Sequence, residues 1–298
     1  GFVIPLLGIA THLAWPIMLG RFIAGIGTSS QPIAQASITD FSSGKKKAFN
    51  LGLIGLSMTL AMVLGPLAAE HLLTVSAPYW IGTGLAVFNI ILLITTFSET
   101  HQANTQSISL RQRLRLLTPA ICLVMLSFFF GEIIWSGYYQ AAYLGFLSRE
   151  FHLTTNTIGI FIASIGLFMC LGLTLVYPLW LKRTSVRHIG LASVIIYTVC
   201  FIPLTLTHHI NAHWLIAPVI ALFFGTFYPC ILHIVSELTP SHSQGWMLGV
   251  ASQILGLAWM LTAFSITLSS QTITLSCLAL GIIATICFTL GTKKNARA

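Results

Sequence analysis

Charged residues are scarce in this sequence of 298 residues. Only 7% of the residues are Asp, Glu, Lys or Arg, with 6 acidic against 14 basic side chains, whereas 56% are hydrophobic. A soluble domain of this size needs far more charge to cover its surface, so lipid must be the solvent for most of the chain. The composition therefore excludes a soluble globular protein.

Several chemical motifs are also missing. The 6 cysteines fall inside apolar runs without CxxC or Cys/His spacing, which predicts reduced thiols packed among helices. No phosphate-binding glycine-rich loop is present, which argues against an ATP-driven pump. His208, His209 and His213 are interpreted as part of a short outer loop without a carboxylate or cysteine partner. We therefore expect no metal and no cofactor.

Long apolar runs dominate what remains. A helix that crosses a bilayer needs about 20 apolar residues, and by that criterion the sequence predicts an all-α polytopic membrane protein. Residues 1–12 are apolar but too short to cross alone, so we expect a further helix that begins before Gly1. The predicted complete spans are 15–38, 49–73, 79–97, 117–146, 156–181, 188–207, 214–238, 245–269 and 273–291.

The basic residues are distributed unevenly between the predicted loops. All but two of them, Arg21 and Arg149, fall in alternate loops and the tail, and that side is expected to be cytoplasmic. This asymmetry explains the net charge of +8 without nucleic acid. We expect an integral protein of the bacterial inner (plasma) membrane with a cytoplasmic C-terminus. The basic stretches are Lys45–Lys47, Arg111–Arg115, Lys182–Arg187 and Lys293–Arg297.

The sequence resembles itself at an offset of 197 residues. Pro32 matches Pro229, Asp40 matches Glu237, and Leu51-Gly52 recurs as Leu248-Gly249. The offset spans an even number of predicted helices, so the two copies have the same orientation, a repeat design found in secondary transporters.

The repeat also predicts the division of the chain. We expect a truncated N-terminal half, a cytoplasmic linker and a C-terminal half, and about 80 further residues before Gly1. The boundaries are 1–97 for the first half (the end of helix 3 and helices 4–6), 98–116 for the linker and 117–298 for the second half (helices 7–12).

Two stretches carry a resemblance to a known family. Gly20–Gly27 followed by Ala36–Asp40 resembles the fourth-helix signature of the major facilitator superfamily. Ala61–Ala69, which contains Gly65-Pro66, is similar to the fifth-helix motif of its drug:proton antiporters, although Ala61, Ala69 and Glu70 replace glycines. The resemblance, closest to the tetracycline and multidrug exporters, implies a twelve-helix bundle of two six-helix halves, here lacking helices 1–2 and part of 3.

Ionisable residues inside predicted spans are costly in lipid and indicate function. Glu132 lies near the middle of the 117–146 span, and Ser136, Tyr139 and Tyr143 follow on the same face. Burial penalises the charged form of a carboxyl, so Glu132 is suited to alternate between protonated and charged states. It would equally attract a cationic substrate, and the structural alternative is a protonated side chain bonded to a neighbouring helix.

Two further ionisable residues have competing interpretations. The resemblance associates Arg21 with proton-coupled transport, and the alternatives are snorkelling or a bond to backbone carbonyls. His233 shares a helix face with Glu237 and would relay protons or hydrogen-bond across a helix interface. Asp40 and Glu237, at equivalent helix ends, are assigned to gating or structure together with Gly65 and Pro66.

These assignments define one hypothesis and three alternatives. Glu132, Arg21 and His233 are the proton-coupling candidates of a proton-coupled exporter of small amphipathic or cationic compounds that works by alternating access. The alternatives are a proton-linked importer of a small metabolite, an integral membrane enzyme, for which no catalytic cluster is found, and a non-functional truncated remnant. We expect a monomer whose partners are a small-molecule substrate, protons and the lipid bilayer, without nucleic acid. The candidate substrate-binding residues are Trp135, Ser136, Tyr138, Tyr139, Gln140 and Tyr143.

Overall fold

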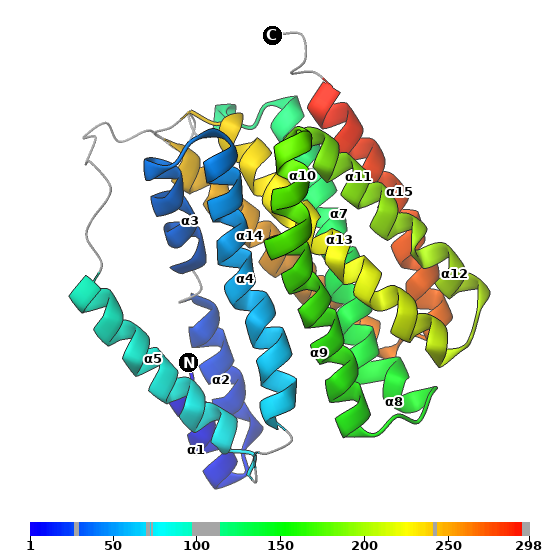
Figure 1. The fold of residues 1–298 in the computed structure, drawn as a ribbon. Coiled ribbons are helices and arrows are strands. Elements are labelled where there is room, and N and C mark those ends of the chain that lie inside the picture. Colours follow the sequence, from blue (N-terminus) through cyan, green and yellow to red (C-terminus); the bar gives the residue numbers. More distant parts are fainter. Residues whose placement is uncertain (27–29, 70–71, 73, 97–113, 241–242, 294–298) are drawn as a thin grey trace.

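The computed structural model describes residues 1–26, 30–69, 72, 74–96, 114–240 and 243–293, without the side chains of residues 30, 39–41, 45 and 69. Over these ranges the chain is built from helices and contains no strand (Figure 1). The predicted all-α architecture is confirmed, and eight helical segments are long and apolar enough to cross a membrane.

The described residues of the first half form five helices. The predicted span 15–38 corresponds to two of them, α2 and α3, which are separated by residues 27–29 outside the described ranges. The helices are α1 (Val3–Thr11), α2 (Ala14–Ile26), α3 (Ser30–Phe41), α4 (Gly44–Ala69) and α5 (Ala77–Thr96).

One boundary in this half corrects the sequence prediction. Lys45–Lys47 were expected in a loop, but α4 begins at Gly44 and takes them into its first turn. A helix can extend beyond the apolar layer, because its backbone bonds are internal and lysine side chains reach toward polar surroundings. Lys47 is only 6% exposed, and its Nζ donates to Oε1 of Gln244, 3.1 Å away.

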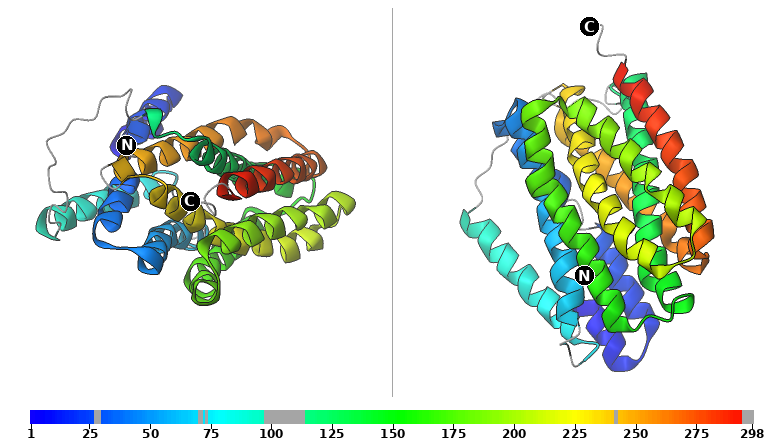
Figure 2. Two further views of the ribbon diagram at one scale, coloured as in Figure 1. Left: turned by 90° about the horizontal axis from the view of Figure 1, so that it is seen from above. Right: turned by 45° about the vertical axis from the view of Figure 1, so that its right-hand side comes forward.

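The second half agrees closely with the predicted spans. Most of the predicted linker 98–116 lies outside the described residues. In the view from above, α7 lies between α14 and α15 (Figure 2). The elements are α7 (Pro119–Ala141), η2 (Ala142–Phe146), α8 (Leu147–Arg149), α9 (Thr155–Leu171), η3 (Gly172–Val176), α10 (Tyr177–Arg183), α11 (Val186–Val199), α12 (Phe201–Leu206), α13 (Ile210–Glu237), α14 (Gln244–Leu261), η5 (Thr262–Thr267) and α15 (Ser270–Lys293).

Threonines cap the starts of two of these helices. The Thr118 hydroxyl accepts a hydrogen bond from the Ile121 N–H at 3.3 Å at the start of α7, and Thr154 does the same for the Thr157 N–H at the start of α9. Each cap satisfies a backbone donor that has no partner inside the helix. The caps explain why both helices begin within three residues of the predicted positions.

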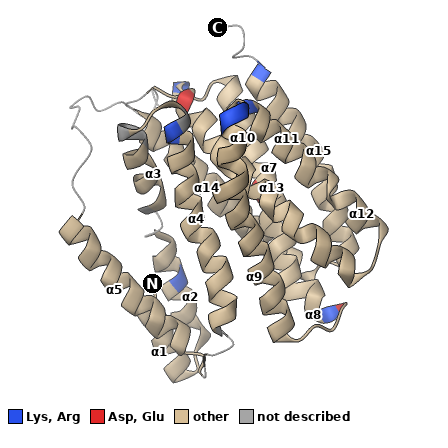
Figure 3. Ribbon diagram, in the orientation of Figure 1, with Lys and Arg blue, Asp and Glu red and all other residues tan. Residues whose placement is uncertain are grey.

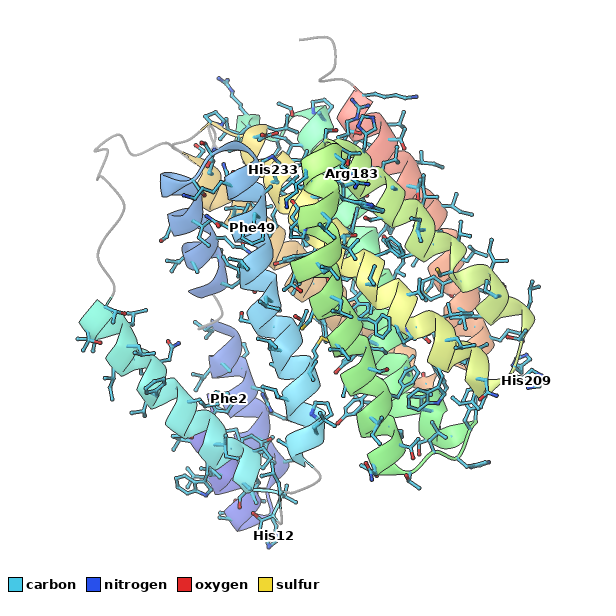
Figure 4. All side chains as sticks on the ribbon, viewed as in Figure 1. Phe2, His12, Phe49, Arg183, His209 and His233 are labelled. Carbon is cyan, nitrogen blue, oxygen red and sulfur yellow. The ribbon has the colours of Figure 1, made fainter. Side chains whose placement is uncertain are left out.

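The two ends of the bundle differ in charge. Most of the described Lys and Arg side chains gather at one end (Figure 3), which we call the basic end. It contains Arg183 and His233, whereas His12 and His209 lie at the opposite end, here called the far end (Figure 4). The basic end is defined by Lys46, Lys182, Arg183, Arg187 and Lys293.

The two halves pack along a seam between α4 and the span formed by α9, η3 and α10. The contacting positions on α4 recur every three or four residues, the spacing of one helix face. A Cβ on Gly166 would lie 3.0 Å from Met62, so any other residue here would make a tight contact and push the two helices slightly apart. The contacting pairs are Gly52 with Tyr177, Gly55 with Leu173, Thr59 with Cys170, Met62 with Gly166 and Pro66 with Gly159.

Two π-helical turns, η2 and η3, interrupt otherwise regular spans. Each turn has five residues, η2 between α7 and α8 and η3 between α9 and α10. A π turn pairs residues i and i+5, so it holds one residue more than an α-helical turn, and such turns occur frequently at functional sites. In this chain η2 carries Tyr143, the last residue of the predicted polar stripe.

Adjacent opposite charges at the end of α8, at the far end, connect it to η5 and α15. The Arg149 guanidinium donates to the backbone carbonyls of Ile266 at 2.5 Å and Leu268 at 3.1 Å, at the end of η5. The Glu150 carboxylate accepts from the Ser270 N–H at 2.9 Å and from the Ser270 hydroxyl, at the start of α15. A cation at a helix C-terminus and an anion at an N-terminus both complement the helix dipole.

The Arg149→Gln variant should be less thermally stable, because the end of η5 loses charge-assisted hydrogen bonds worth about 1 kcal/mol. We expect Tm in detergent to fall by about 2 °C. Arg183→Gln, which changes an exposed arginine at the basic end, is the matched control. An equal Tm for the two variants would contradict the role given to Arg149.

Candidate functional site

Glu132 is buried in the middle of the bundle. Its side chain is 2% exposed on α7, and the side chain of Trp259 on α14 lies close enough to interact with its carboxyl. The hydroxyls of Tyr197 and Tyr228 lie close enough to interact electrostatically with it. Within the described part of the chain no Lys, Arg or His forms an ion pair with Glu132. The carboxyl is therefore surrounded by aromatic rings rather than by cations.

Thr262, the first residue of η5, connects two residues of the predicted stripe to α14. Its hydroxyl lies 2.8 Å from the Ser136 hydroxyl and accepts from Gln140 Nε2 at 2.9 Å. Gln140 Nε2 also donates to the Trp259 carbonyl at 3.3 Å. These bonds fix the polar face of α7 against the end of α14, which carries Trp259, and the start of η5.

Stacked aromatic rings extend along the same face of α7. Trp135 stacks on Phe224 of α13 with ring centroids 4.9 Å apart and an interplanar angle of 9°. Tyr139 stacks on Trp135 at 6.0 Å, and Tyr143 stacks on Tyr139 at 6.2 Å. We call these four rings the aromatic ladder. Exposure rises along it, from 4% at Trp135 to 40% at Tyr143.

Two glutamines of α3 reach the second half beside this site. Gln31 Nε2 donates to the Tyr228 hydroxyl at 2.7 Å, and Gln35 Nε2 donates to the same hydroxyl at 3.1 Å. Oε1 of Gln35 and the hydroxyl of Tyr197 are buried without a hydrogen-bond partner among the described residues. Buried polar atoms are nearly always hydrogen-bonded, so these two groups are available to water or to a ligand.

Tyr138 does not join the predicted substrate-binding residues. It is 1% exposed, and its hydroxyl lies 2.9 Å from Nδ1 of His213. Its ring packs edge-on against Phe201. His213, expected in a loop, is inside α13. Neighbouring residues of a helix point about 100° apart, so Tyr138 faces the core of the second half while Tyr139 belongs to the aromatic ladder.

Arg21 also lies apart from Glu132. Its guanidinium carbon is 5.6 Å from the ring centroid of Tyr79, the third residue of α5. This cation–π contact stays inside the first half. The structure therefore does not bring together the predicted pair of Arg21 and Glu132.

His233 belongs to a separate polar group at the basic end. Its Nε2 lies 2.9 Å from Oε1 of Glu237, one turn later on α13. Lys47 is close enough to interact electrostatically with the imidazole, and its Nζ bonds to Gln244. We call His233, Glu237, Lys47 and Gln244 the basic-end junction, because they join α4 to α13 and α14. The side chain of Asp40, predicted as the equivalent of Glu237, lies outside the described residues.

Gly65 and Pro66, the remaining gating candidates, lie in the last turns of α4. Pro66 and Leu67 line a cavity of about 300 Å³ together with Tyr143 of η2 and Asn156 and Gly159 of α9. We call this the far-end cavity. A Cβ on Gly65 would meet no atom within 4 Å among the described residues.

Sequence reasoning missed several residues of the site. Gln31 and Gln35 are amides spaced by four in an apolar run, a signal that could have been used. Trp259 and Thr262 show no local signal, because aromatic and hydroxyl residues are common in membrane helices and their partners lie more than 100 residues away in sequence.

Comparisons with known proteins identify the fold and the family. The family model described as Major Facilitator Superfamily matches residues 1–263. The chain belongs to the major facilitator superfamily. Members of this superfamily are transporters rather than enzymes, so the prediction that the chain is not an enzyme is confirmed.

Curated relatives of this major facilitator chain are similar at low identity. The class C tetracycline resistance protein of Escherichia coli is 23% identical over 259 residues, which cover 83% of the chain and 64% of the relative. The class B protein of Escherichia coli is 24% identical over 255 residues, which cover 79% of the chain and 61% of the relative. The chain thus spans less than two thirds of the length of these relatives.

Solved structures share the major facilitator fold at still lower identity. The human organic anion transporter TETRAN superposes with a TM-score of 0.80 at 14% identity, over 96% of this chain and 73% of that one. The Escherichia coli fucose:proton symporter superposes with a TM-score of 0.73 at 13% identity, over 98% and 80%. Since one of these proteins is an organic anion transporter and the other a sugar symporter, the fold does not determine the substrate.

Thr262→Val should destabilise the chain, because the hydroxyl of Ser136 and the amide of Gln140 each lose a partner. We expect a cost of about 1–2 kcal/mol and a Tm in detergent lower by about 2–4 °C. Thr262→Ser keeps the hydroxyl and is the matched control. If serine and valine lower Tm equally, the hydroxyl does not organise the site.

Proposed function

We propose that the chain is the greater part of a proton-coupled exporter of small amphipathic or cationic compounds, working by alternating access. The observation that supports this most is the buried Glu132 without a described cationic partner, held among aromatic rings between α7, α13 and α14. The similarity to tetracycline resistance proteins supports export of drug-like compounds.

Because Glu132 is buried, its carboxylate needs to be neutralised, and either a proton or a cationic substrate can do this. A carboxylate transferred from water into apolar surroundings costs several kcal/mol unless it is neutralised. A proton neutralises it in one state, and a cationic substrate neutralises it in another. Binding of one therefore favours release of the other, which is the exchange that an antiporter requires.

The aromatic ladder and the unpartnered polar groups complete the proposed substrate site. The half-exposed Tyr143 offers a ring surface for cation–π and stacking contacts, and Trp135 and Tyr139, which are stacked behind it, offer their ring edges. The hydroxyl of Tyr197 and Oε1 of Gln35 offer hydrogen bonds to a bound molecule. Because Gln35 belongs to the first half and Glu132 to the second, a ligand between them would contact both halves, as alternating access requires.

The basic end is proposed to face the cytoplasm, following the positive-inside rule. In this orientation the basic-end junction closes the cytoplasmic end, and the far-end cavity faces outward. The junction acts as a latch, because Lys47 and Gln244 lie on different halves and must separate for the cytoplasmic end to open. His233 and Glu237 serve this latch rather than the substrate.

A proton-linked importer is the second candidate, and the structural similarity to the fucose:proton symporter favours it. The two candidates differ in the direction of proton movement when substrate is added to vesicles. An exporter exchanges substrate for a proton, so proton and substrate move in opposite directions, whereas a symporter moves them together.

Glu132→Gln should abolish transport driven by a pH gradient, because the amide neither binds a proton nor attracts a cation. The measurement is substrate uptake into inverted vesicles with an imposed gradient, using the whole transporter. Glu132→Asp keeps the carboxyl and should retain part of the activity. Gradient-driven uptake by the Gln variant at the wild-type rate would remove Glu132 from the coupling mechanism.

Gln244→Leu should open the basic end more often, because Lys47 loses its bond across the two halves. The loss of about 1 kcal/mol would raise the open population about fivefold. Maleimide labelling of the buried Cys230, located by mass mapping, measures opening at this end. Gln271→Leu, on α15, is the control. Unchanged labelling of Cys230 would show that the Lys47–Gln244 bond is not part of a latch.

A further inference from the structure

The far-end cavity has the dimensions and lining of a small-molecule site. Its volume of about 300 Å³ lies at the lower end of the range for ligand pockets. Pro66 and Leu67 supply apolar surface, whereas Tyr143, Thr155 and Asn156 supply polar groups. None of the residues that line it is charged. A mostly apolar cavity with a few polar groups binds an uncharged amphipathic surface.

The cavity interrupts the seam between the two halves. From Gly52 to Met62, successive turns of α4 contact α9, η3 and α10 at regular intervals. At the last turn, a Cβ on Gly159 would still lie 3.7 Å from the Pro66 carbonyl oxygen, so an alanine fits there without strain. The opening beside this contact is therefore part of the junction between halves and not a defect inside one half.

The aromatic ladder connects this cavity to the buried site. Trp135, which follows Glu132 by one turn of α7, is the second ring of the ladder, and Tyr143 is the last ring and lines the cavity. Each ring is stacked on the previous one, so the ladder forms a continuous row of ring edges along α7 that an aromatic molecule can contact. A cationic group is attracted only by Glu132, because the residues that line the cavity carry no charge.

We propose that the far-end cavity is a second binding station for the flat aromatic part of the transported compound, reached from Glu132 along the aromatic ladder. This rests on the proposed function and narrows its substrate class to planar aromatic amphipaths, with or without a positive charge. Glu132 selects the cationic group, whereas Tyr143, Thr155 and Asn156 contact the polar edge of the ring system.

Cysteine labelling tests the station directly in the 298-residue chain reconstituted in lipid vesicles. The variant Asn156→Cys is labelled with a membrane-impermeant maleimide, with and without ethidium, a flat aromatic cation, or phenanthridinone, its uncharged tricyclic relative. At about ten times its Kd, either probe should slow labelling about tenfold. With Glu132→Gln added, phenanthridinone should still protect, because the cavity carries no charge.

Three controls define the comparison. Ser148→Cys, exposed on α8 at the same end and outside the cavity lining, should be labelled equally with and without probe. Gly159→Leu, which fills the cavity, should remove protection at Asn156→Cys, whereas Gly159→Ala should keep it. The unsubstituted chain gives the background from its native cysteines.

Several results would overturn the proposal. Labelling of Asn156→Cys that neither probe slows, or protection that survives Gly159→Leu, would show that the cavity does not bind the ring system. Labelling that is blocked in vesicles without probe but fast in detergent would assign the cavity to a lipid chain. Failure of the proposed function is distinguishable, because in that case Glu132→Gln leaves ethidium binding, measured by its fluorescence, unchanged.

Discussion

A polar side chain inside a bilayer has no water to bond with, so it must find its partners on neighbouring helices, and this constraint organises the second half of the chain. Thr262 bonds to Ser136 and Gln140. Three residues later, the Ser265 hydroxyl donates to the Gly137 carbonyl at 3.0 Å. Arg149 continues the same connection at the far end. The span of α7, η2 and α8 is therefore joined to η5, the continuation of α14, and the position of Trp259 near Glu132 depends on that junction.

Two hydrogen bonds between the halves follow the repeat. Gln31 bonds to Tyr228 and Lys47 bonds to Gln244, and each pair is separated by 197 residues, the offset of the internal repeat. Residues at equivalent positions in the two copies of the repeat meet only near the two-fold axis that relates the copies. At such a place the two copies cannot stay identical, since two lysines would repel each other and two tyrosines would crowd. An amide opposite a phenol and an amide opposite an ammonium resolve this conflict.

The fold followed from the sequence because apolar run length and loop charge are local properties. The sequence predicts the candidate site only in part. Helical spacing predicts Ser136, Tyr139 and Tyr143 on one face of α7, as the structure has them, but the predicted substrate-binding residues also include Tyr138, which points into the core. Hydrophobicity does not separate these faces, because both are apolar in a membrane helix. The contact between Glu132 and Trp259 and the burial of Lys47 depend on distant segments, so no local pattern indicates them. Arg21 stood out for its cost in lipid, yet an aromatic ring of its own half accepts it.

The π turn η2 has a consequence for how this chain is compared with its relatives. It holds one residue more than an α-helical turn, and each residue of a helix adds a rotation of about 100°. A relative with a regular helix here would align with this chain only across a one-residue gap within Ala142–Phe146. On one side of that gap Glu132 and Ser136 would keep their register, whereas beyond it every side chain would be displaced around the helix. Alignment without the gap would assign the wrong partner to Arg149 and Glu150, although the rest of the span would match.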